Sequence, residues 1–416
     1  MVAFFLPLAG LGALVYLVTP ISAQVPTVSL LIDSSTRLSA AEALNLNLRS
    51  VLSQVSSRKG ATFHFGSTYS TPSSAEAAWT SNIFSTFFSA VVAENDCKWY
   101  ATEPTRGTFT LSACEAVSSL AGAHGATFRG HNTFWHQQLP SWLPGTVTAT
   151  DLVQNVIPTH VAGVIKGLGT NVSSWDVMNE LITDSATTAM NSYQCVQNAD
   201  RWPTVTADGG STALETNLQF VYAAFKTALT NAPTTATLVY NDYSTGGSDA
   251  KDNCVFKLLA DINANASIPY NRLGVGYQSH VGAQAGYFVP KAQLEATFAQ
   301  LNSLGAKALI TEMDMWIQAN DTVDQRYQAA IWGDYLDACL YASNCFEFTN
   351  WDNRDDTSWI TPGNGHGVAM ATLFDSNGNP KTVTYELIAR LQRYASGVSE
   401  MCATALGSSS CTVPST

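Results

Sequence analysis

The chain has little charge, and most of the charge it has is negative. Only 12% of its 416 residues are charged, against roughly a quarter in typical soluble domains. It has 20 Lys and Arg residues and 32 Asp and Glu residues, which give a formal net charge of −12, and no run of basic residues interrupts this pattern. Nucleic acids and anionic membrane surfaces would repel such a chain. The composition therefore excludes both as expected partners and is compatible with a neutral polymer.

Several motifs that mark common enzyme classes are missing. The sequence contains no G-x-S-x-G, no H-E-x-x-H, no phosphate-binding P-loop and no G-x-G-x-x-G after a predicted strand. Its cysteines do not form the paired C-x-x-C units of a zinc site, and His131 and His136 are a weak signal for a metal ion. We therefore expect neither a cofactor nor a metal ion.

Long apolar runs are confined to the amino terminus. Residues 1–23 are apolar, then small, and are followed by Gln24, which is typical of a cleaved secretory signal peptide. An uncleaved membrane anchor is the alternative. No other segment has 18 consecutive apolar residues, so we expect a secreted, extracellular protein without membrane contact after cleavage.

The cysteine count and the glycan acceptors agree with an oxidising compartment. Eight cysteines form an even set, and N-x-[ST] acceptors for a glycoprotein occur at Asn171, Asn265 and Asn320. Cys339 and Cys345 lie close enough in sequence to join a helix end to the next strand. The remaining pairs would be Cys97–Cys114, Cys195–Cys254 and Cys402–Cys411, although sequence alone does not fix their connectivity.

The order of apolar segments predicts one large α/β domain. A variable lead-in over residues 24–60, with a helix within residues 39–54, precedes a short strand, a loop and a helical segment that repeat eight times over residues 61–395. Strands that alternate with helices imply parallel pairing, and eight such units indicate a (β/α)8 TIM barrel. Residues 396–416 form a Ser- and Thr-rich tail, and we expect the protein to be a monomer.

Polar residues gather at the carboxyl ends of the predicted strands, which form one rim in a barrel of this kind. Two of the acids among them are candidates for catalysis: Glu180 follows the fourth strand and Glu312 lies at the end of the seventh. Two carboxylates across a rim could flank one glycosidic bond. Their separation would decide the stereochemistry, with about 5–5.5 Å giving retention and about 6.5–9.5 Å giving inversion, and the sequence leaves this open.

The residues around these acids suit the same chemistry. Asn179 could bind a sugar hydroxyl, His280 could keep Glu312 ionised, and Asp314 could orient His280. Sugar rings have apolar C–H faces that stack on indoles. We expect Lys98, His131 and His136 to donate to sugar hydroxyls. We also expect five tryptophans to lie in or beside rim loops: Trp99, Trp135, Trp142, Trp351 and Trp359.

At this point the motifs resemble glycoside hydrolase family 10, the retaining endo-1,4-β-xylanases. The blocks that carry the resemblance are ENDCKWYATEPTRGTF, GHNTFWHQQLPSW, WDVMNE, NDY, QSH, ITEMD and LFDSNGNPK, in the order and spacing of the family over residues 62–395. The resemblance implies that Glu180 is the acid/base, that Glu312 is the nucleophile and that the reaction retains configuration. It also implies a sugar-binding shell of Glu94, Asn95, Lys98, His131, Trp135, Asn179, Asn241, Gln278, His280, Trp351 and Trp359.

The chain departs from the family pattern at some positions. Asp352 stands where the family generally has glycine after Trp351, Cys97 replaces an aliphatic residue, and the segment after Glu180 is unlike the common fungal pattern. These departures bear on the substrate more than on the chemistry. Two alternatives to a secreted xylanase that hydrolyses xylan are therefore kept. One is a glycosidase of the same fold that acts on a plant glycoalkaloid, saponin or aryl glycoside, and the other is a catalytically silent carbohydrate-binding protein.

Overall fold

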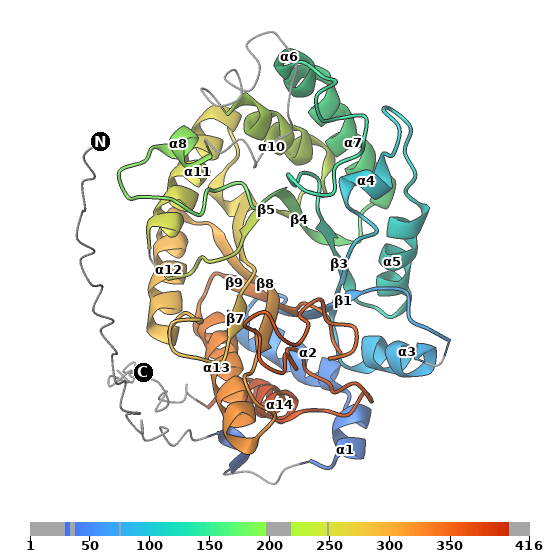
Figure 1. Ribbon diagram of the computed structural model, residues 1–416, viewed down its shortest axis with the longest axis vertical. Helices are drawn as coiled ribbons and strands as arrows, with labels where there is room; N and C mark the ends of the chain where they lie inside the picture. Colours follow the sequence, from blue (N-terminus) through green and yellow to red (C-terminus); the bar gives the residue numbers. More distant parts are fainter. Residues whose placement is uncertain (1–29, 34–37, 75, 197–217, 248, 399–416) are drawn as a thin grey trace, which may run out of the picture.

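The computed structural model describes residues 30–33, 38–74, 76–196, 218–247 and 249–398 (Figure 1). The predicted signal peptide, most of the predicted tail and the pair Cys402–Cys411 lie outside these residues. Within the described part of the chain, no helix combines the length and the apolar character that crossing a lipid bilayer requires.

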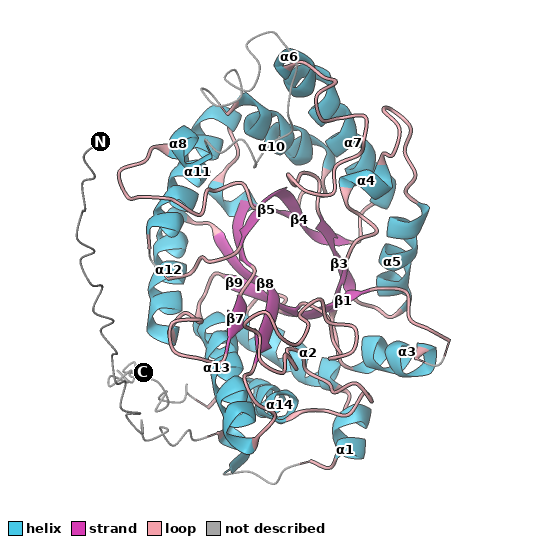
Figure 2. Cartoon of the chain, in the orientation of Figure 1, coloured by secondary structure: helices cyan, strands magenta, loops and turns pink. Residues whose placement is uncertain are grey.

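Eight parallel strands close into a barrel, as the sequence predicts (Figure 2). Neighbours along the chain pair with one another, β6 pairs with β8, and β9 closes the ring against β1. A short ninth strand, β7 (His280–Gly282), pairs with the outer end of β8. The barrel strands are β1 (His64–Tyr69), β2 (Ala90–Ala93), β3 (Thr127–His131), β4 (Val172–Asn179), β5 (Thr237–Asp242), β6 (Leu273–Tyr277), β8 (Lys307–Trp316) and β9 (Cys345–Asn350).

The helices form an outer layer around the strands (Figure 1). Every residue of β5 is buried, because helices cover its outer face and side chains fill the barrel on its inner face. The helices are α1 (Ala40–Asn45), α2 (Leu48–Lys59), α3 (Ala77–Thr86), α4 (Trp99–Thr102), α5 (Ser112–Ala123), α6 (Ala149–Asp151), α7 (Ile157–Leu168), α8 (Ser192–Val196), α10 (Gln219–Asn231), α11 (Ala250–Ala266), α12 (Lys291–Leu304), α13 (Thr322–Tyr341) and α14 (Thr382–Ala395), with short helical turns at η1 (Leu31–Asp33), η2 (Leu152–Val156) and η4 (Tyr270–Arg272).

The lead-in differs from the prediction. A single helix was predicted within residues 39–54, and the structure has two helices there, α1 and α2. Ser39 caps α1 by accepting from the N–H of Glu42, and the helix ends at Asn45. Leu46 then takes an extended conformation and Asn47 leaves the helical region before α2 begins. Apolar residues of α2, among them Leu48 and Val55, are buried in the main core. The described lead-in therefore packs as part of the barrel's outer layer.

Disulfides fasten three loops of the barrel. The structure contains Cys97–Cys114, Cys195–Cys254 and Cys339–Cys345, with Cα–Cα distances of 4.8, 5.7 and 5.0 Å. These are the three expected pairs that fall within the described residues. Cys339–Cys345 joins the carboxyl-terminal end of α13 to the start of β9, as its position in the sequence predicts.

Candidate active site

Glu180 follows the last residue of β4 at the carboxyl-terminal rim of the barrel. Its backbone lies in the left-handed region, with φ of 54°, which costs a residue with a side chain about 1–2 kcal/mol. The Glu180 N–H donates to the carbonyl of Asn241 on β5 at 2.8 Å, and this bond holds the turn. Strand pairing therefore fixes the direction in which the Glu180 side chain leaves the rim.

Two neutral donors hold the Glu180 carboxyl group. The indole Nε1 of Trp135 donates to Oε2 at 2.7 Å, and Nε2 of Gln278 donates to Oε1 at 2.9 Å. Burial raises the pKa of Glu180, the negative charge of Glu312 raises it further, and the bonds from Gln278 and Trp135 offset only part of the rise. Glu180 thus has a tendency to keep its proton.

Glu312, on β8, has the opposite electrostatic surroundings. Its carboxylate accepts from Nδ2 of Asn241 at 2.6 Å and lies 3.2 Å from Nε2 of His280 and 3.8 Å from Nδ1 of His131. Burial alone would raise its pKa, but His131, His280 and the Arg129 guanidinium together lower the pKa of Glu312 to about 2. This carboxylate is therefore ionised at ordinary pH.

A chain of amide side chains connects the two carboxyl groups. Asn241 donates to Oδ1 of Asn179 at 2.8 Å as well as to Glu312, and Gln278 lies 3.4 Å from the same Asn179 oxygen while it donates to Glu180. The hydroxyl of Thr311 donates to Oδ1 of Asn241 at 2.6 Å, which fixes the orientation of that amide. The acids from β4 and β8 thus belong to one hydrogen-bonded site.

A second network supports Glu312 from the outer side. Nδ1 of His280 lies 2.8 Å from Oδ2 of Asp314, and the indole of Trp359 donates to the same oxygen at 2.7 Å. Because Asp314 raises the pKa of His280 against the effect of burial, the imidazole is held in its charged form beside Glu312. Trp351 follows β9 and packs edge-on against His131, with ring centroids 5.1 Å apart.

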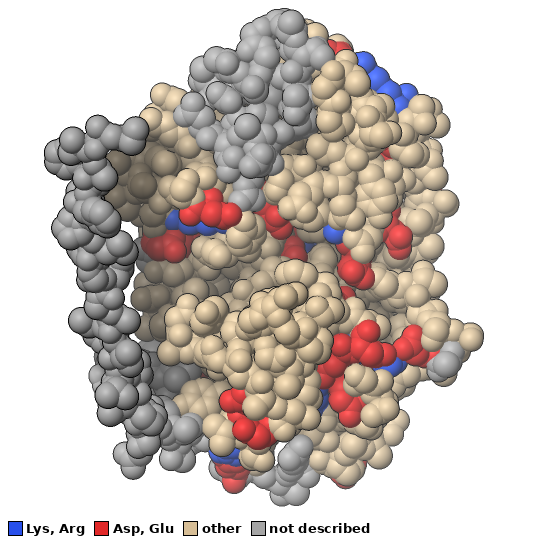
Figure 3. Space-filling model, in the orientation of Figure 1, with Lys and Arg blue, Asp and Glu red and all other residues tan. Residues whose placement is uncertain are grey.

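The remaining predicted binding residues follow β2. Nζ of Lys98 donates to Oδ1 of Asn95 at 2.9 Å and lies 4.8 Å from the centroid of the Trp135 ring, and Ser70 donates to the Glu94 carboxylate. Burial lowers the pKa of Lys98, and the surrounding carboxylates, Glu312 and Glu94 first among them, oppose that shift. Figure 3, in the same orientation, shows patches of Asp and Glu and few Lys or Arg side chains on this face.

Asp352 lies beside this site, as its position after Trp351 predicts, and its side chain is buried. Its φ is 59°, a left-handed conformation that glycine adopts freely and Asp tolerates better than most residues. Its carboxyl group accepts from the backbone N–H of Trp359 at 3.0 Å and lies 3.3 Å from the Thr68 hydroxyl. Burial, with the charges of Glu94 and Asp314, raises the pKa of Asp352 to about 8.

Two of the five tryptophans, Trp99 and Trp142, have packing roles. Trp142 lies in the loop after β3, as predicted, whereas Trp99 lies in α4, so the prediction of a loop position is wrong for Trp99. Trp99 begins α4, is buried and stacks on the ring of His160 with centroids 4.0 Å apart. The indole of Trp142 donates to the backbone carbonyl of Glu103 at 2.9 Å and packs edge-on against Trp99. The two indoles help to join α4 to α7. Trp135, Trp351 and Trp359 instead contact Glu180, His131 and Asp314, respectively.

Comparison with known proteins identifies the family of this chain. A sequence model of glycosyl hydrolase family 10 matches residues 52–390. The chain belongs to glycoside hydrolase family 10. It is therefore a glycoside hydrolase, and a catalytically silent binding protein no longer fits the chain.

Relatives of this glycoside hydrolase are similar over most of its length. It is 29% identical to endo-1,4-beta-xylanase D of Talaromyces funiculosus over 79% of this chain and 75% of that protein. It is 31% identical to endo-1,4-beta-xylanase C of Phanerodontia chrysosporium over 70% of this chain and 67% of that protein.

Solved structures agree with the barrel. The glycosylated endo-beta-1,4-xylanase of Gloeophyllum trabeum matches with a TM-score of 0.66 and 26% identity, over 80% of this chain and 98% of that one. Xylanase 10B of Thermotoga maritima matches with a TM-score of 0.70 over 85% of this chain and 100% of that one, and at 23% identity it supports the fold alone.

The sequence analysis did not predict a buried ion-pair cluster that lies beside Glu312 in this family 10 enzyme. Arg129 on β3 is fully buried, bonds the Asp176 carboxylate, lies 2.9 Å from Glu347 and donates to the backbone carbonyl of Thr311 at 2.6 Å. His131 lies 2.8 Å from the same Asp176 carboxylate. The signal for this cluster was the presence of Arg129 and His131 two residues apart on one face of an otherwise apolar strand.

One group of side chains in the described part of the enzyme has the composition of a metal site. Donor atoms of His131, Asp176 and Glu312 all lie within 4.8 Å of one another. Arg129 already supplies a positive charge to Asp176, and His280 supplies one to Glu312. A cation there would have to displace or repel these groups, so the donor set suits an ion-pair cluster better than a metal ion.

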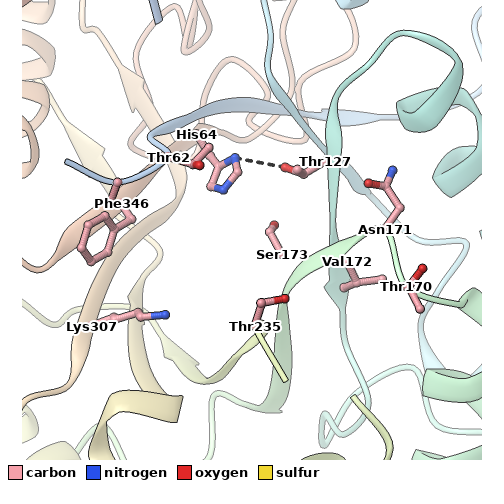
Figure 4. Close-up of a pocket in the computed structure, with 11 residues that line it drawn as sticks. Thr62, His64, Thr127, Thr170, Asn171, Val172, Ser173, Thr235, Lys307 and Phe346 are labelled. Carbon is pink, nitrogen blue, oxygen red and sulfur yellow. Dashed lines mark hydrogen bonds between the residues drawn. The ribbon is translucent and has the colours of Figure 1, made fainter. Parts of the chain in front are cut away.

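A cavity of about 410 Å³ occupies the other end of the barrel. Figure 4 shows its lining, which includes the first residues of four strands: His64 of β1, Thr127 of β3, Val172 of β4 and Lys307 of β8. His64 and Thr127 are joined by a hydrogen bond of 3.1 Å. Because both acids lie toward the carboxyl ends of their strands, this cavity is separate from the catalytic site.

Proposed function

We propose that this protein is a secreted endo-1,4-β-xylanase that hydrolyses β-1,4-xylosidic bonds in xylan by double displacement, with retention of configuration. The observation that carries the proposal is the opposite direction of the two pKa shifts, with burial raising the pKa of Glu180 and neighbouring cations lowering that of Glu312 to about 2. Two carboxyl groups whose surroundings separate their pKa values are suited to the roles of acid and nucleophile. The names of the relatives support xylan as the substrate.

In the first step, the ionised Glu312 carboxylate attacks the anomeric carbon while protonated Glu180 donates its proton to the leaving glycosidic oxygen. A covalent glycosyl-enzyme forms as the glycosidic bond breaks. In the second step, Glu180, now ionised, accepts a proton from water, and the water oxygen attacks the anomeric carbon and releases Glu312. Two inversions at one carbon give net retention.

The neighbouring residues prepare these groups. Asn241 and His280 donate to Glu312 and leave it a single orientation, and Asp314 holds His280 in turn. Asn179, placed between the two acids, is suited to a hydroxyl next to the reacting carbon. The rest of the proposed shell, from which sugar hydroxyls and ring faces gain contacts, consists of Glu94, Asn95, Lys98, His131, Trp135, Gln278, Trp351 and Trp359.

Substitution of Glu312 tests the assignment. Glu312→Ala should lower turnover of xylan by several orders of magnitude, because no nucleophile remains, while thermal unfolding stays cooperative. Glu312→Ala is compared with Glu115→Gln, which removes an exposed carboxyl group on α5 and should leave turnover unchanged. Near-normal hydrolysis by the Glu312 variant would refute the mechanism. Proton NMR of the first product would show the β-anomer if configuration is retained.

Parallel assays on different substrates test the substrate class. Purified enzyme is given arabinoxylan, a steroidal glycoalkaloid and an aryl glycoside in parallel, and kcat/KM is measured for each. We expect arabinoxylan to be the preferred substrate. A preference for the glycoalkaloid or for another saponin would replace xylan as the substrate while leaving the roles of Glu180 and Glu312 intact.

Secretion is the remaining part of the proposal, and it rests on residues 1–23. Expression of the full chain in a secreting fungal host should release protein whose amino terminus begins at Gln24. We expect the secreted protein to have the mass of a monomer in solution. Retention of residues 1–23 on a membrane-bound product would contradict the cleaved signal.

A further inference from the structure

The two most exposed large hydrophobic side chains of the described residues pack on residues of two neighbouring strands, β7 and β8. Tyr287 is 59% exposed and Trp359 is 53% exposed. Trp359 packs edge-on against His280, with centroids 5.1 Å apart, and Tyr287 packs edge-on against Trp316 at 5.2 Å. His280 belongs to β7 and Trp316 to β8, which pair directly. Single exposed aromatics are ordinary, but two on adjoining supports suggest a binding surface.

The support behind Tyr287 is rigid. Its carbonyl accepts from the N–H of Gly282 at 3.1 Å, and its own N–H donates to the carbonyl of Gln284 at 3.0 Å. Gly282 is required there, because a Cβ atom at this position would clash with the indole of Trp316. The tyrosine ring is thus presented to solvent by a tight turn, which lowers the conformational entropy that binding would cost.

A glycine-rich loop supports the other side of Trp316. The ring of His366 lies 5.8 Å from that of Trp316, centroid to centroid. The loop is fastened to the end of β8, since Val368 donates to the carbonyl of Ile317 at 3.1 Å and Ile317 donates to that of Ala369 at 3.0 Å. The sequence GNGHG, which matches no phosphate-binding pattern, therefore has a structural use beside this aromatic cluster.

We propose that Tyr287, backed by Trp316 and His366, is a second stacking surface for the substrate chain, beyond Trp359 and remote from the bond that is cleaved. This inference rests on the proposed function. Trp316 lies four residues past Glu312 on β8, or roughly 13 Å at about 3.3 Å per residue, so the surface is too far away to contact the reacting sugar. Its occupant is a sugar ring of a long β-1,4-linked chain, because Tyr287 and Trp359 pack on two neighbouring strands.

Chain-length dependence tests the proposal. Tyr287→Ala should raise KM for soluble arabinoxylan about tenfold, which corresponds to about 1.4 kcal/mol, and leave kcat and the hydrolysis of xylotriose within twofold. Tyr287→Phe keeps the ring and should restore KM. The matched control is Tyr193→Ala, which removes another exposed tyrosine, 39% exposed on α8, and should change neither substrate. Equal thermal stability of the variants shows that the comparison concerns binding.

Other outcomes would overturn the proposal. If Tyr287→Ala leaves KM for arabinoxylan unchanged, a remote stacking surface is excluded. It is also excluded if Tyr287→Ala raises KM equally for arabinoxylan and for xylotriose. If the wild-type enzyme hydrolyses neither substrate, the proposed function fails, and the surface is judged by electrophoretic retardation in gels that contain arabinoxylan, hydroxyethylcellulose or galactomannan. Retardation that is lost in Tyr287→Ala and kept in Tyr193→Ala would support the proposed stacking surface. Equal retardation of the two variants would refute it.

Discussion

Asp352 accepts a hydrogen bond from the backbone N–H of Trp359 at 3.0 Å, and through this bond a buried acid positions an exposed indole. The indole of Trp359 in turn donates to Asp314, which lies 2.8 Å from His280, and His280 lies 3.2 Å from Glu312. Asp352, the residue that departs from the family pattern, is therefore linked to the proposed nucleophile by four successive contacts, the first of which is to the backbone of Trp359.

The stability of the enzyme should depend on pH through Asp352. Its pKa is about 8 in the folded protein, against about 3.9 in an unfolded chain, so the folded state binds the proton more tightly. The stabilisation from this proton is complete below about pH 4 and is lost as the pH rises through about 8. Asp352→Asn, which is neutral throughout, should melt at a temperature that rises relative to wild type between pH 4 and pH 8.

Calorimetric melting temperatures over this pH range measure the effect. Glu115→Gln, which removes an exposed carboxyl group on α5, serves as the control and should follow wild type at every pH. A constant difference in melting temperature between Asp352→Asn and wild type would show that Asp352 does not titrate with folding.

The alkaline limb of the activity profile should respond to Trp135. Its indole donates to the Glu180 carboxylate, and a donor to the charged form lowers the pKa of the acid. Trp135→Phe removes that donor, so the pKa of Glu180 should rise and the fall of kcat/KM at high pH should move to higher pH. The profile is recorded on an aryl xyloside.

Trp142→Phe is the matched control for this experiment. The Trp142 indole donates to the backbone carbonyl of Glu103 and not to Glu180, so its loss should leave the alkaline limb in place. An unchanged limb in Trp135→Phe would mean that Glu180 is not the group whose ionisation ends activity.

Arg129 should contribute to both stability and chemistry. Removing one partner of a buried ion pair leaves uncompensated charges, here Asp176 and Glu347, and typically costs about 3–5 kcal/mol. Arg129→Met should lower the free energy of unfolding by that amount. Because the Arg129 charge also lowers the pKa of Glu312, the acid limb of kcat/KM should move to higher pH.

Arg106→Met gives the comparison for Arg129. Arg106 is ion-paired with Asp151 on the surface, where its side chain is 50% exposed, and such pairs contribute about 0–1 kcal/mol. Chemical denaturation of both variants separates the two cases. Similar losses for Arg129→Met and Arg106→Met would contradict the structural role given to Arg129.

A disulfide that closes a longer loop should stabilise the enzyme more than one that closes a shorter loop. Cys195–Cys254 encloses a separation of 59 residues and Cys339–Cys345 one of 6. Chain entropy gives about 4 kcal/mol for the longer loop and about 2 kcal/mol for the shorter. Paired Cys→Ser replacement at each, followed by urea denaturation, should show the larger loss for Cys195–Cys254, and the reverse order would indicate that strain or residual structure dominates.

Much of the barrel was predictable, because its signals are local. Each of the eight strands is a short apolar run that ends in polar residues, and such a run is visible without knowledge of its partners. The break between α1 and α2 was not predictable in the same way, since the stretch around Asn47 has an acceptable helical composition. Tertiary packing of α2 against the core, together with the cap at Ser39, decided where each helix begins.

Recognition of Trp99 and Trp142 as packing residues also required the structure. A tryptophan near a strand end can face the cleft or the helix layer, and the sequence pattern is the same for both. Their indoles meet around Glu103 and His160, which are distant in sequence, so only the folded chain distinguishes them from Trp135 and Trp359.

By itself the sequence determined the alternation of strands and helices, the order of the catalytic motifs and the identity of the two acids, because periodicity and motif spacing are properties of neighbouring residues. Only the tertiary structure shows the physical cause that shifts the pKa values of Glu180 and Glu312 in opposite directions. That difference comes from burial and from charges contributed by other strands, with His131, His280 and Arg129 surrounding Glu312 while neutral Trp135 and Gln278 bond Glu180.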